Sequence, residues 1–307
     1  MIRRSLLALA RSHRVKAWAM ALPVTRNVVA RFVPGETIEG CLEAVRTLGQ
    51  DGLLASIDHL GEDTTSPDQA ETARDAYLSL LRRLSEQDLV GQAEVSVKLT
   101  ALGLGLPHGE TVALRHARDI CAAAARVGTT VTVDMEDHTW TEATLGILEA
   151  LRVDHPDTGG VLQAYLHRTP EDCRRFSLPG ARIRLCKGAY AEPAAVAHQT
   201  PAAVATAYRD CLNILMAGPG HPMVATHDPA MITAALDLIR EHGRDPMSYE
   251  FQMLYGIRAD EQRRLAAAGH RVRVYVPYGT DWWGYFLRRL AERPANLAFF
   301  LRALIGS

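Results

Sequence analysis

Eight short apolar runs recur along the 307-residue chain, and most of the intervals between them are long enough for a helix. Strand-like runs that alternate with helical patterns predict βα units and a parallel sheet. Eight such units can close into a (βα)8 barrel, whose chemistry lies at the carboxyl ends of its strands. We therefore expect an α/β fold of this kind. The runs begin near Leu53, Glu94, Thr129, Gly160, Ala181, Met223, Tyr249 and Arg271.

The residues before the first run predict helical structure. Thr37 is a suitable N-cap for a helix that continues to Leu48, and Gly49 and Gly52 would end it. We expect residues 1–50 to form an N-terminal helical arm and residues 51–307 to form the barrel domain. Further helical patterns cover residues 69–88, 110–127, 141–152, 201–216, 229–242 and 259–268, and a short one follows Pro170.

The charge and cysteine content narrow the class of protein. The formal net charge is −1 and the pI is about 6.9, so no overall field would attract nucleic acid. The number of cysteines is odd and no Cys-x-x-Cys occurs, which favours reduced thiols in a reducing compartment. We expect a cytoplasmic protein that acts on a small molecule. The cysteines are Cys41, Cys121, Cys173, Cys186 and Cys211.

The first 35 residues are basic and amphipathic, with no acidic residue before Glu36. Such an arm could touch an anionic membrane, in this case the inner face of the cell membrane. It could equally pack on the barrel or on a second subunit, so homo-oligomerisation also stays open. No apolar stretch approaches the roughly 18 residues that a spanning helix needs.

Most of the apolar runs end in an ionisable or amide side chain. Lys98 and Asp134 close the second and third runs, so we expect them to lie on nearby strands at one rim. In the fifth run, period-two alternation places Arg182, Arg184 and Cys186 on the same strand face. A buried arginine needs an anionic partner, either a ligand or a barrel carboxylate. The residues that end the runs are Asp58, Lys98, Asp134, Gln163, Lys187, His227 and Tyr275.

A final helix is predicted after the eighth run, from an N-cap at Thr280 or Asp281 to Pro294. Its adjacent Arg288 and Arg289 lie about 100° apart around the helix axis. If this helix crosses the barrel mouth, both guanidinium groups can bind one carboxylate, for which the planar arginine side chain is well suited. Otherwise one of the two arginines faces solvent.

In these strand-end and helix segments, the chain resembles the proline dehydrogenase family of the monofunctional bacterial type. The same domain occurs in bifunctional proline utilisation flavoproteins. The resemblance spans roughly residues 35–305, and its eight segments follow the family order. They are VSVKLTALG, VDMEDHTW, LQAYLHRT, RLCKGAY, ATHDP, EFQMLYGIR, YVPYG and RRLAERP.

The resemblance implies a distorted (βα)8 barrel that holds FAD without a covalent bond. It implies oxidation of L-proline to 1-pyrroline-5-carboxylate by hydride transfer to flavin N5, with electrons passed to a membrane quinone. This reaction is the first step of proline catabolism to glutamate. The first 35 residues match the family least, so peripheral membrane contact is the least transferable expectation.

The resemblance also implies roles for individual residues. Asp134, Arg184 and Tyr275 would be catalytic, with Arg184 beside flavin N5 and Tyr275 packed over the proline ring. Arg288 and Arg289, supported by Lys98, would bind the proline carboxylate, and Glu292 would orient their helix. The residues that match flavin-contacting positions are Met135, Gln163, Arg184, Cys186, Lys187, Gly188, Ala189, Thr226 and His227.

The residues alone leave three other readings open. Lys98 or Lys187 at a strand end could form a Schiff base, as in an aldolase or decarboxylase. A colourless module that only binds carboxylates would also use the arginines. A metal-dependent hydrolase could use the acidic cluster of Asp134, Glu136, Asp137 and His138, although we expect no metal site.

Overall fold

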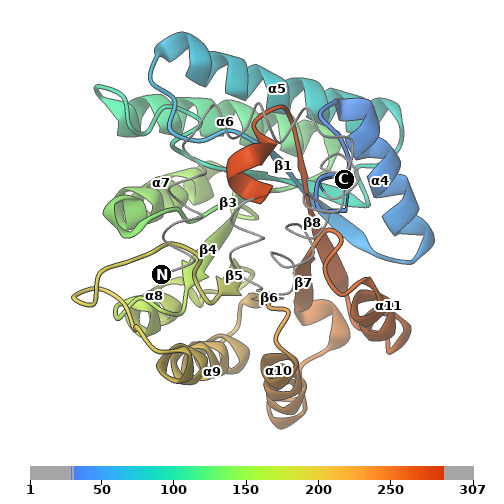
Figure 1. Cartoon of the computed structure of the whole chain (residues 1–307), viewed down its shortest axis with the longest axis vertical. Coiled ribbons are helices and arrows are strands. Elements are labelled where there is room, and N and C mark those ends of the chain that lie inside the picture. Colours follow the sequence, from blue (N-terminus) through green and yellow to red (C-terminus); the bar gives the residue numbers. More distant parts are fainter. Residues whose placement is uncertain (1–28, 30, 287–307) are drawn as a thin grey trace, which may run out of the picture.

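The computed structural model describes Val29 and residues 31–286, and its eight strands form a closed parallel barrel (Figure 1). Each strand pairs with the next along the chain, and β8 pairs with β1. Each predicted apolar run contains one strand, so the predicted α/β barrel is confirmed. The strands are β1 (Leu54–His59), β2 (Ala93–Val97), β3 (Val131–Val133), β4 (Gly159–Gln163), β5 (Arg182–Cys186), β6 (His221–Ala225), β7 (Glu250–Leu254) and β8 (Val272–Tyr278).

Helices alternate with these strands and form the outer ring (Figure 1). Three of them begin with a capping side chain followed by proline, a pattern in which the cap binds an unpaired N–H and proline needs none. Ser66, Thr200 and Asp228 are these caps, for α5, α9 and α10. The helices between strands are α5 (Pro67–Glu86), α6 (Gly109–Val127), α7 (Thr141–Asp154), α8 (Thr169–Phe176), α9 (Pro201–Ala217), α10 (Pro229–Glu241) and α11 (Ala259–Ala267).

Helix α4 (Ile38–Gln50) precedes β1 and packs against both β1 and β8. Thr37 caps it as predicted, because its hydroxyl accepts a hydrogen bond from the Gly40 N–H. The helix buries Cys41, Leu42 and Val45 against the barrel. The helix before the barrel therefore covers the seam where the last strand meets the first.

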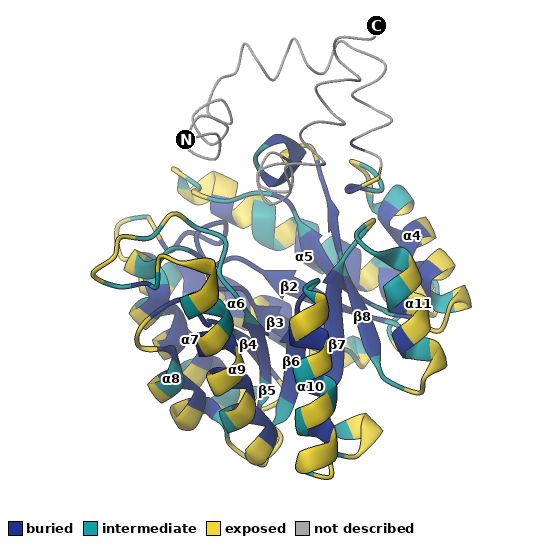
Figure 2. Ribbon diagram, turned by 60° about the horizontal axis from the view of Figure 1, so that its bottom comes forward, coloured by how far each residue is buried: buried dark blue, intermediate teal, exposed yellow. Residues whose placement is uncertain are grey.

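Residues 279–286, which follow β8, lie at the carboxyl end of the barrel. Residues 282–286 are helical, and Figure 2 shows this short segment beyond the strand ends. It forms an apolar cluster with Leu60, which follows β1, and with two residues near the start of the described chain, Phe32 and Val33. Trp282, Trp283 and Phe286 supply most of its aromatic surface.

The apolar core lies between the strands and the helices, whereas the inside of the barrel is polar. Figure 2 shows that the strands are mainly buried, whereas the outer faces of the helices are exposed. Strand residues such as Ile57, Val97 and Val133 belong to the apolar core between strands and helices and are buried. The alternate positions point inward. Polar residues on this inward face include Ser56, Asp58, Glu94, Ser96, Arg184, Gln252, Arg273 and Tyr275.

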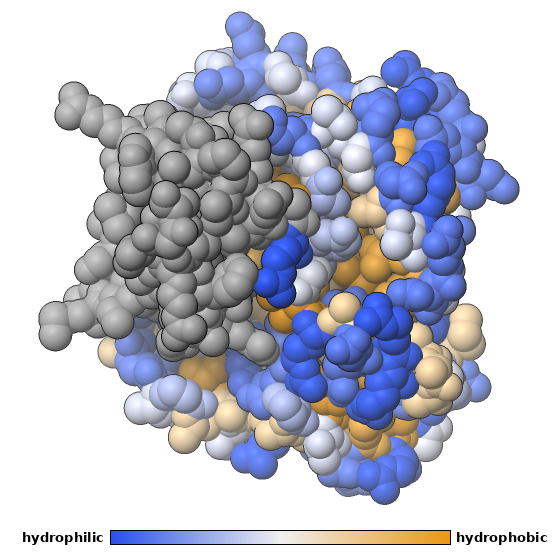
Figure 3. All heavy atoms as spheres, turned by 45° about the vertical axis from the view of Figure 1, so that its right-hand side comes forward, coloured by the Kyte–Doolittle hydropathy of each residue, from blue (hydrophilic) through white to orange (hydrophobic). Residues whose placement is uncertain are grey.

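On the face seen in Figure 3, charged and polar side chains cover much of the described surface, with apolar residues in the recesses between them. All five cysteines are free thiols, and four of them are buried. Among the residues that the structure describes, no helix combines the length and the apolar character required to cross a bilayer.

Candidate active site

Five inward-facing side chains meet at the carboxyl end of the barrel, and we call them the mouth cluster: Asp58, Lys98, Asp134, Arg184 and Tyr275. Parallel pairing brings them together, since Asp58 is in register with Ser96 and Ser56 is in register with Tyr275. The sequence places all five at or near the ends of its apolar runs. The structure confirms that they share one rim.

Arg184, on β5, is held by hydrogen bonds to side chains from β1, β2 and β7 and from the residue that follows β3. Its guanidinium donates to Asp134 Oδ1 at 2.6 Å, to Ser96 Oγ at 2.9 Å and to Ser56 Oγ at 3.1 Å, and its Nε donates to Gln252. The sequence left open whether the partner of this arginine is a ligand or a barrel carboxylate. The structure shows a carboxylate, and the guanidinium is fixed in one orientation.

Asp134 is the common acceptor of the mouth cluster. Its Oδ1 also accepts from Ser96 Oγ at 2.8 Å, and its Oδ2 accepts from the Tyr275 hydroxyl at 2.6 Å. Burial, followed by the negative charges of Asp134 and Asp58, holds the pKa of Tyr275 well above its usual value. The phenol therefore stays protonated and serves as a donor, while its ring lies 5.4 Å from the Arg184 guanidinium carbon.

Lys98 is closer to Asp58 than to Asp134. Its Nζ lies 2.6 Å from Asp58 Oδ2, 3.7 Å from Asp134 Oδ2 and 3.3 Å from the Tyr275 hydroxyl. Burial by itself lowers the pKa of Lys98, but the charges of Asp58 and Asp134 outweigh burial and the pKa is raised. Lys98 therefore stays a cation although it is buried. The expected proximity to Asp134 is present, with Asp58 as the nearer carboxylate.

A second layer of charges fills the barrel below the mouth cluster. Glu94 accepts a hydrogen bond from Arg182 and lies 3.7 Å from Arg184 and 3.8 Å from Arg273, while Arg273 binds Glu250 at 2.8 Å. Burial favours the neutral form of Glu94, but the three arginines outweigh it and lower the pKa of this carboxyl. Sequence reasoning missed Glu94 and Glu250, although period-two alternation from Lys98 and Gln252 marks both as inward-facing.

Several predicted cofactor residues line the same end of the barrel. Gln163, at the end of β4, donates from Nε2 to the Glu136 carbonyl at 3.1 Å. Its buried Oε1 has no hydrogen-bond partner among the residues that the structure describes. His227 Nε2 accepts from the Leu254 N–H at 2.9 Å, which places the proton of a neutral ring on Nδ1. Met135 and Thr226 are also buried.

The segment between β5 and α9 carries the remaining predicted cofactor residues. Cys186 ends β5, Lys187 Nζ pairs with Asp228 at 2.6 Å, and Gly188 has a φ of 106°, which favours glycine. A Cβ at Gly188 would lie 2.3 Å from the Tyr165 ring, so a side chain at this position would displace that ring. Ala189 follows in the same segment.

A buried carboxylate fixes this segment to its neighbours. Glu192 accepts hydrogen bonds from the His138 N–H at 3.0 Å, from the His138 ring and from the Tyr165 hydroxyl at 3.2 Å. No local pattern in the sequence singles out Glu192. Its partners belong to the segments that follow β3 and β4, so the pairing depends on the closed barrel.

The acidic cluster proposed as a metal site divides into separate contacts. Glu136 binds the N–H and hydroxyl of Thr100, Asp137 caps the short helix η1 (His138–Trp140), and His138 binds Glu192. Within residues 31–286 and Val29, no three His, Cys, Asp or Glu side chains are arranged to hold a metal ion. Arg288, Arg289 and Glu292 lie outside the described residues.

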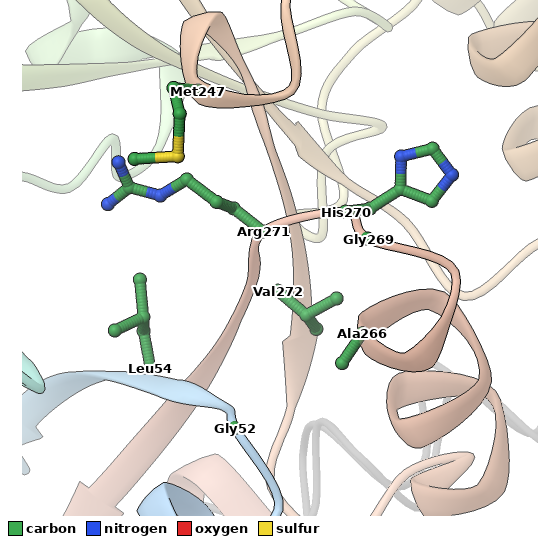
Figure 4. A pocket seen from close by; sticks show the side chains of 8 residues that line it. All are labelled: Gly52, Leu54, Met247, Ala266, Gly269, His270, Arg271 and Val272. Carbon is green, nitrogen blue, oxygen red and sulfur yellow. The ribbon is translucent and has the colours of Figure 1, made fainter.

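A pocket of about 390 Å³ lies at the opposite, amino end of the barrel (Figure 4). It opens between the starts of β1 and β8, where the Arg271 and Met247 side chains lie near each other. None of the predicted site residues lines it. The lining residues are Gly52, Leu54, Met247, Ala266, Gly269, His270, Arg271 and Val272.

Comparison with known proteins matches residues 41–302 to the family described as proline dehydrogenase. The chain is 40% identical to proline dehydrogenase 1 of Bacillus subtilis over 99% of both chains. It is also 40% identical to proline dehydrogenase of Deinococcus radiodurans, over 91% of this chain and 90% of the relative.

Solved structures share the fold. Proline utilization A from Bdellovibrio bacteriovorus, inactivated by N-propargylglycine, superposes with a TM-score of 0.80 at 23% identity. The match covers 87% of this chain but 32% of that larger one, and at this identity it supports the fold alone. The family match and the near-complete alignment with its curated members lead to one assignment: the chain belongs to the proline dehydrogenase family.

Proposed function

We propose that this protein oxidises L-proline to 1-pyrroline-5-carboxylate with FAD as cofactor and passes the electrons to a membrane quinone, as the first step of proline catabolism to glutamate. The observation that carries the proposal is the mouth cluster. In a chain that is 40% identical to curated proline dehydrogenases, it joins Lys98, Asp134, Arg184 and Tyr275 in one hydrogen-bonded group at the catalytic end of a barrel.

The strand ends around the mouth cluster fit a flavin. Gln163 Oε1 is a buried acceptor without a partner in the described part of the chain, and a buried acceptor of this kind is normally satisfied by some donor. Gly188 and Ala189 add small residues beside it, and Lys187 adds a half-exposed cation. Bound FAD would supply the hydride acceptor. The residues that would hold it are Met135, Gln163, Arg184, Cys186, Lys187, Gly188, Ala189, Thr226 and His227.

The substrate carboxylate needs cations at the mouth of the barrel. Lys98 is held as a buried cation, and Arg288 and Arg289 would join it from the last predicted helix. The Tyr275 ring would pack against the proline ring, since its hydroxyl is already used by Asp134. Removal of a hydride from the carbon beside the amine depends mainly on this positioning.

Arg184 would contribute a fixed positive charge. Its hydrogen bonds to Asp134, Ser96 and Ser56 hold the guanidinium in place before the reaction. A preorganised charge in a site that excludes water stabilises developing negative charge more strongly than water does. We propose that Asp134 and Tyr275 act with Arg184 as the catalytic group.

The organisation of the chain completes the proposal. Residues 1–50 would be a helical arm, and residues 51–307 would form the catalytic barrel with its last helix over the mouth. The protein would be cytoplasmic and would meet the quinone through peripheral contact with the inner face of the membrane, to which the basic residues of the first 35 positions are suited.

The direct test uses the purified holoprotein with L-proline and a soluble quinone. The proposal predicts quinone reduction that depends on proline, with 1-pyrroline-5-carboxylate identified by mass spectrometry. Borohydride treatment in the presence of a keto acid checks the Schiff-base alternative, because only a lysine imine would be trapped. A trapped lysine together with no proline-dependent quinone reduction would contradict the proposal.

A further inference from the structure

Asp58 is a buried carboxylate that the proposed reaction does not yet use. It lies near the end of β1, is fully shielded from solvent and places Oδ2 2.6 Å from Lys98 Nζ. Its other carboxylate oxygen, Oδ1, lies 3.3 Å from the Tyr77 hydroxyl of α5. Burial of a charged aspartate carries a large desolvation free energy unless a cation lies next to the carboxylate. Lys98 is that cation.

The second carboxylate near Lys98 is already engaged. Asp134 accepts from Arg184 and Ser96 on one oxygen and from Tyr275 on the other, and it stands 3.7 Å from Lys98 Nζ. An ammonium group is a compact charge on a flexible stem, so its position depends on the acceptors around it. The short contact with Asp58 therefore sets where the Lys98 Nζ lies.

We propose that Asp58 is a positioning residue for substrate binding: it holds Lys98 as an oriented cation at the mouth of the barrel, ready for the carboxylate of proline. The inference rests on the proposed function and adds a residue to it. Asp58 acts through Lys98 and does not touch the substrate. The remaining N–H groups of Lys98 are then directed toward Tyr275 and the mouth of the barrel.

The charges around Lys98 define what the loss of Asp58 would do. The groups that face it are Asp58, Asp134 and the Tyr275 hydroxyl, with Glu62 also contributing negative charge. Without the Asp58 charge, burial acts against the cation and the pKa of Lys98 falls. The ammonium would also shift toward Asp134, which accepts hydrogen bonds from Arg184 and Tyr275, and away from the position that meets the substrate carboxylate.

The test compares Asp58→Asn with the wild-type holoenzyme, because asparagine keeps the shape of the side chain and removes its charge. We expect the KM for proline to rise about tenfold or more, while kcat changes about threefold or less. Tetrahydro-2-furoic acid, a carboxylate analogue of proline without the amine, should lose affinity by a similar factor. The alkaline limb of the kcat/KM profile should move to lower pH.

A double-mutant cycle separates positioning from general damage. In the K98A background, D58N should change the KM no further, because the residue through which it acts is absent. The thermal midpoint gives an independent readout: D58N should lower it in wild type and raise it in K98A, where it removes an unpaired buried charge.

Asp172→Asn is a matched control. Asp172 is also a buried aspartate, paired with Arg168 at 2.7 Å on α8, away from the mouth cluster. This variant should lose stability with no change in the KM for proline. Two results would overturn the role of Asp58 but not the proposed function, provided that the wild type oxidises proline. In one, D58N leaves the KM and the inhibitor affinity unchanged. In the other, the effect of D58N persists in full in the K98A background. A wild type that neither binds nor oxidises proline would overturn the proposed function, and the inference with it.

Discussion

The Arg184 guanidinium and the Asp134 carboxylate form a 2.6 Å ion pair that joins β5 to the end of β3 inside the barrel. Ser96 Oγ binds both partners, at 2.9 Å from Arg184 and 2.8 Å from Asp134. The pair is almost completely buried, so each charge depends on the other for its stability. The same ion pair therefore contributes to the stability of the barrel and forms part of the proposed catalytic group.

Asp134→Asn should impair both catalysis and folding. It would leave the buried Arg184 without its closest counter-ion, for which a loss of about 3–5 kcal/mol in the free energy of unfolding is typical. The catalytic efficiency with proline should fall by at least about a hundredfold, since Tyr275 and Arg184 lose their common acceptor. Urea denaturation and steady-state kinetics measure the two effects. Ser96→Ala keeps the ion pair and should therefore have a smaller effect than Asp134→Asn on both stability and catalytic efficiency. Equal effects of the two substitutions would argue against the ion pair as the main determinant of these two properties.

Arg288→Ala or Arg289→Ala should reduce kcat/KM for proline by an amount equivalent to about 2–5 kcal/mol, the range for losing one partner of a buried charge pair. Both arginines lie beyond the described residues, so this prediction depends on the family resemblance. Kinetics with proline at fixed pH measure it. Unchanged kcat/KM in both variants would remove the two arginines from the carboxylate site.

Tyr275 should restrict the substrate ring. Its hydroxyl is fixed on Asp134 at 2.6 Å, so its aromatic ring has little freedom to move aside for a hydroxylated substrate. Tyr275→Ser should therefore raise the activity toward hydroxyproline relative to proline. Tyr275→Phe keeps the ring and should leave that ratio near the wild-type value, while it weakens catalysis through Asp134. A ratio that stays flat in Tyr275→Ser would contradict the packing role.

Glu136 should make stability depend on pH. Burial raises the pKa of this carboxyl to about 7. The hydrogen bonds from Thr100 and the positive charge of Lys98 act in the opposite direction, whereas the negative charge of Glu62 raises the pKa further. The unfolded carboxyl titrates near 4.3, so above that pH the folded protein binds a proton that the unfolded chain has released. The stabilising contribution is present below the unfolded pKa and is lost as the pH rises through the folded pKa.

This loss amounts to roughly 3 kcal/mol between pH 4.5 and 7. Glu136→Gln removes the titration and keeps acceptor and donor atoms for Thr100. Its free energy of unfolding relative to wild type should therefore increase between pH 5 and pH 8, as measured by chemical denaturation at each pH. A difference that does not vary with pH would show that Glu136 titrates normally in the folded protein.

The strands and most helix starts could be predicted because local signals determine them. The apolar runs end close to where β1 to β8 end, and Thr37 caps α4 as its side-chain chemistry indicates. The mouth cluster was also foreseeable, since parallel strands bring their carboxyl ends to one rim. Lys98, Asp134, Arg184 and Tyr275 therefore follow from run position and family resemblance together.

The pairing inside the barrel could not be predicted, because it depends on the register and closure of the sheet. Lys98 lies nearest to Asp58 because β1 and β2 pair with Asp58 opposite Ser96. Glu94 meets arginines from β5 and β8, which are distant in sequence. Glu192 likewise finds its partners on two other segments. Such contacts join residues that no local pattern relates.

The visible absorption spectrum of the purified holoprotein, recorded before and after anaerobic addition of L-proline, tests the central claim most directly. The account predicts the yellow absorption of an oxidised flavin that bleaches when proline is added, and bleaching that is much weaker in Asp134→Asn at the same proline concentration. A colourless protein that stays colourless when FAD is supplied, or a flavin band that proline leaves unchanged, would contradict it.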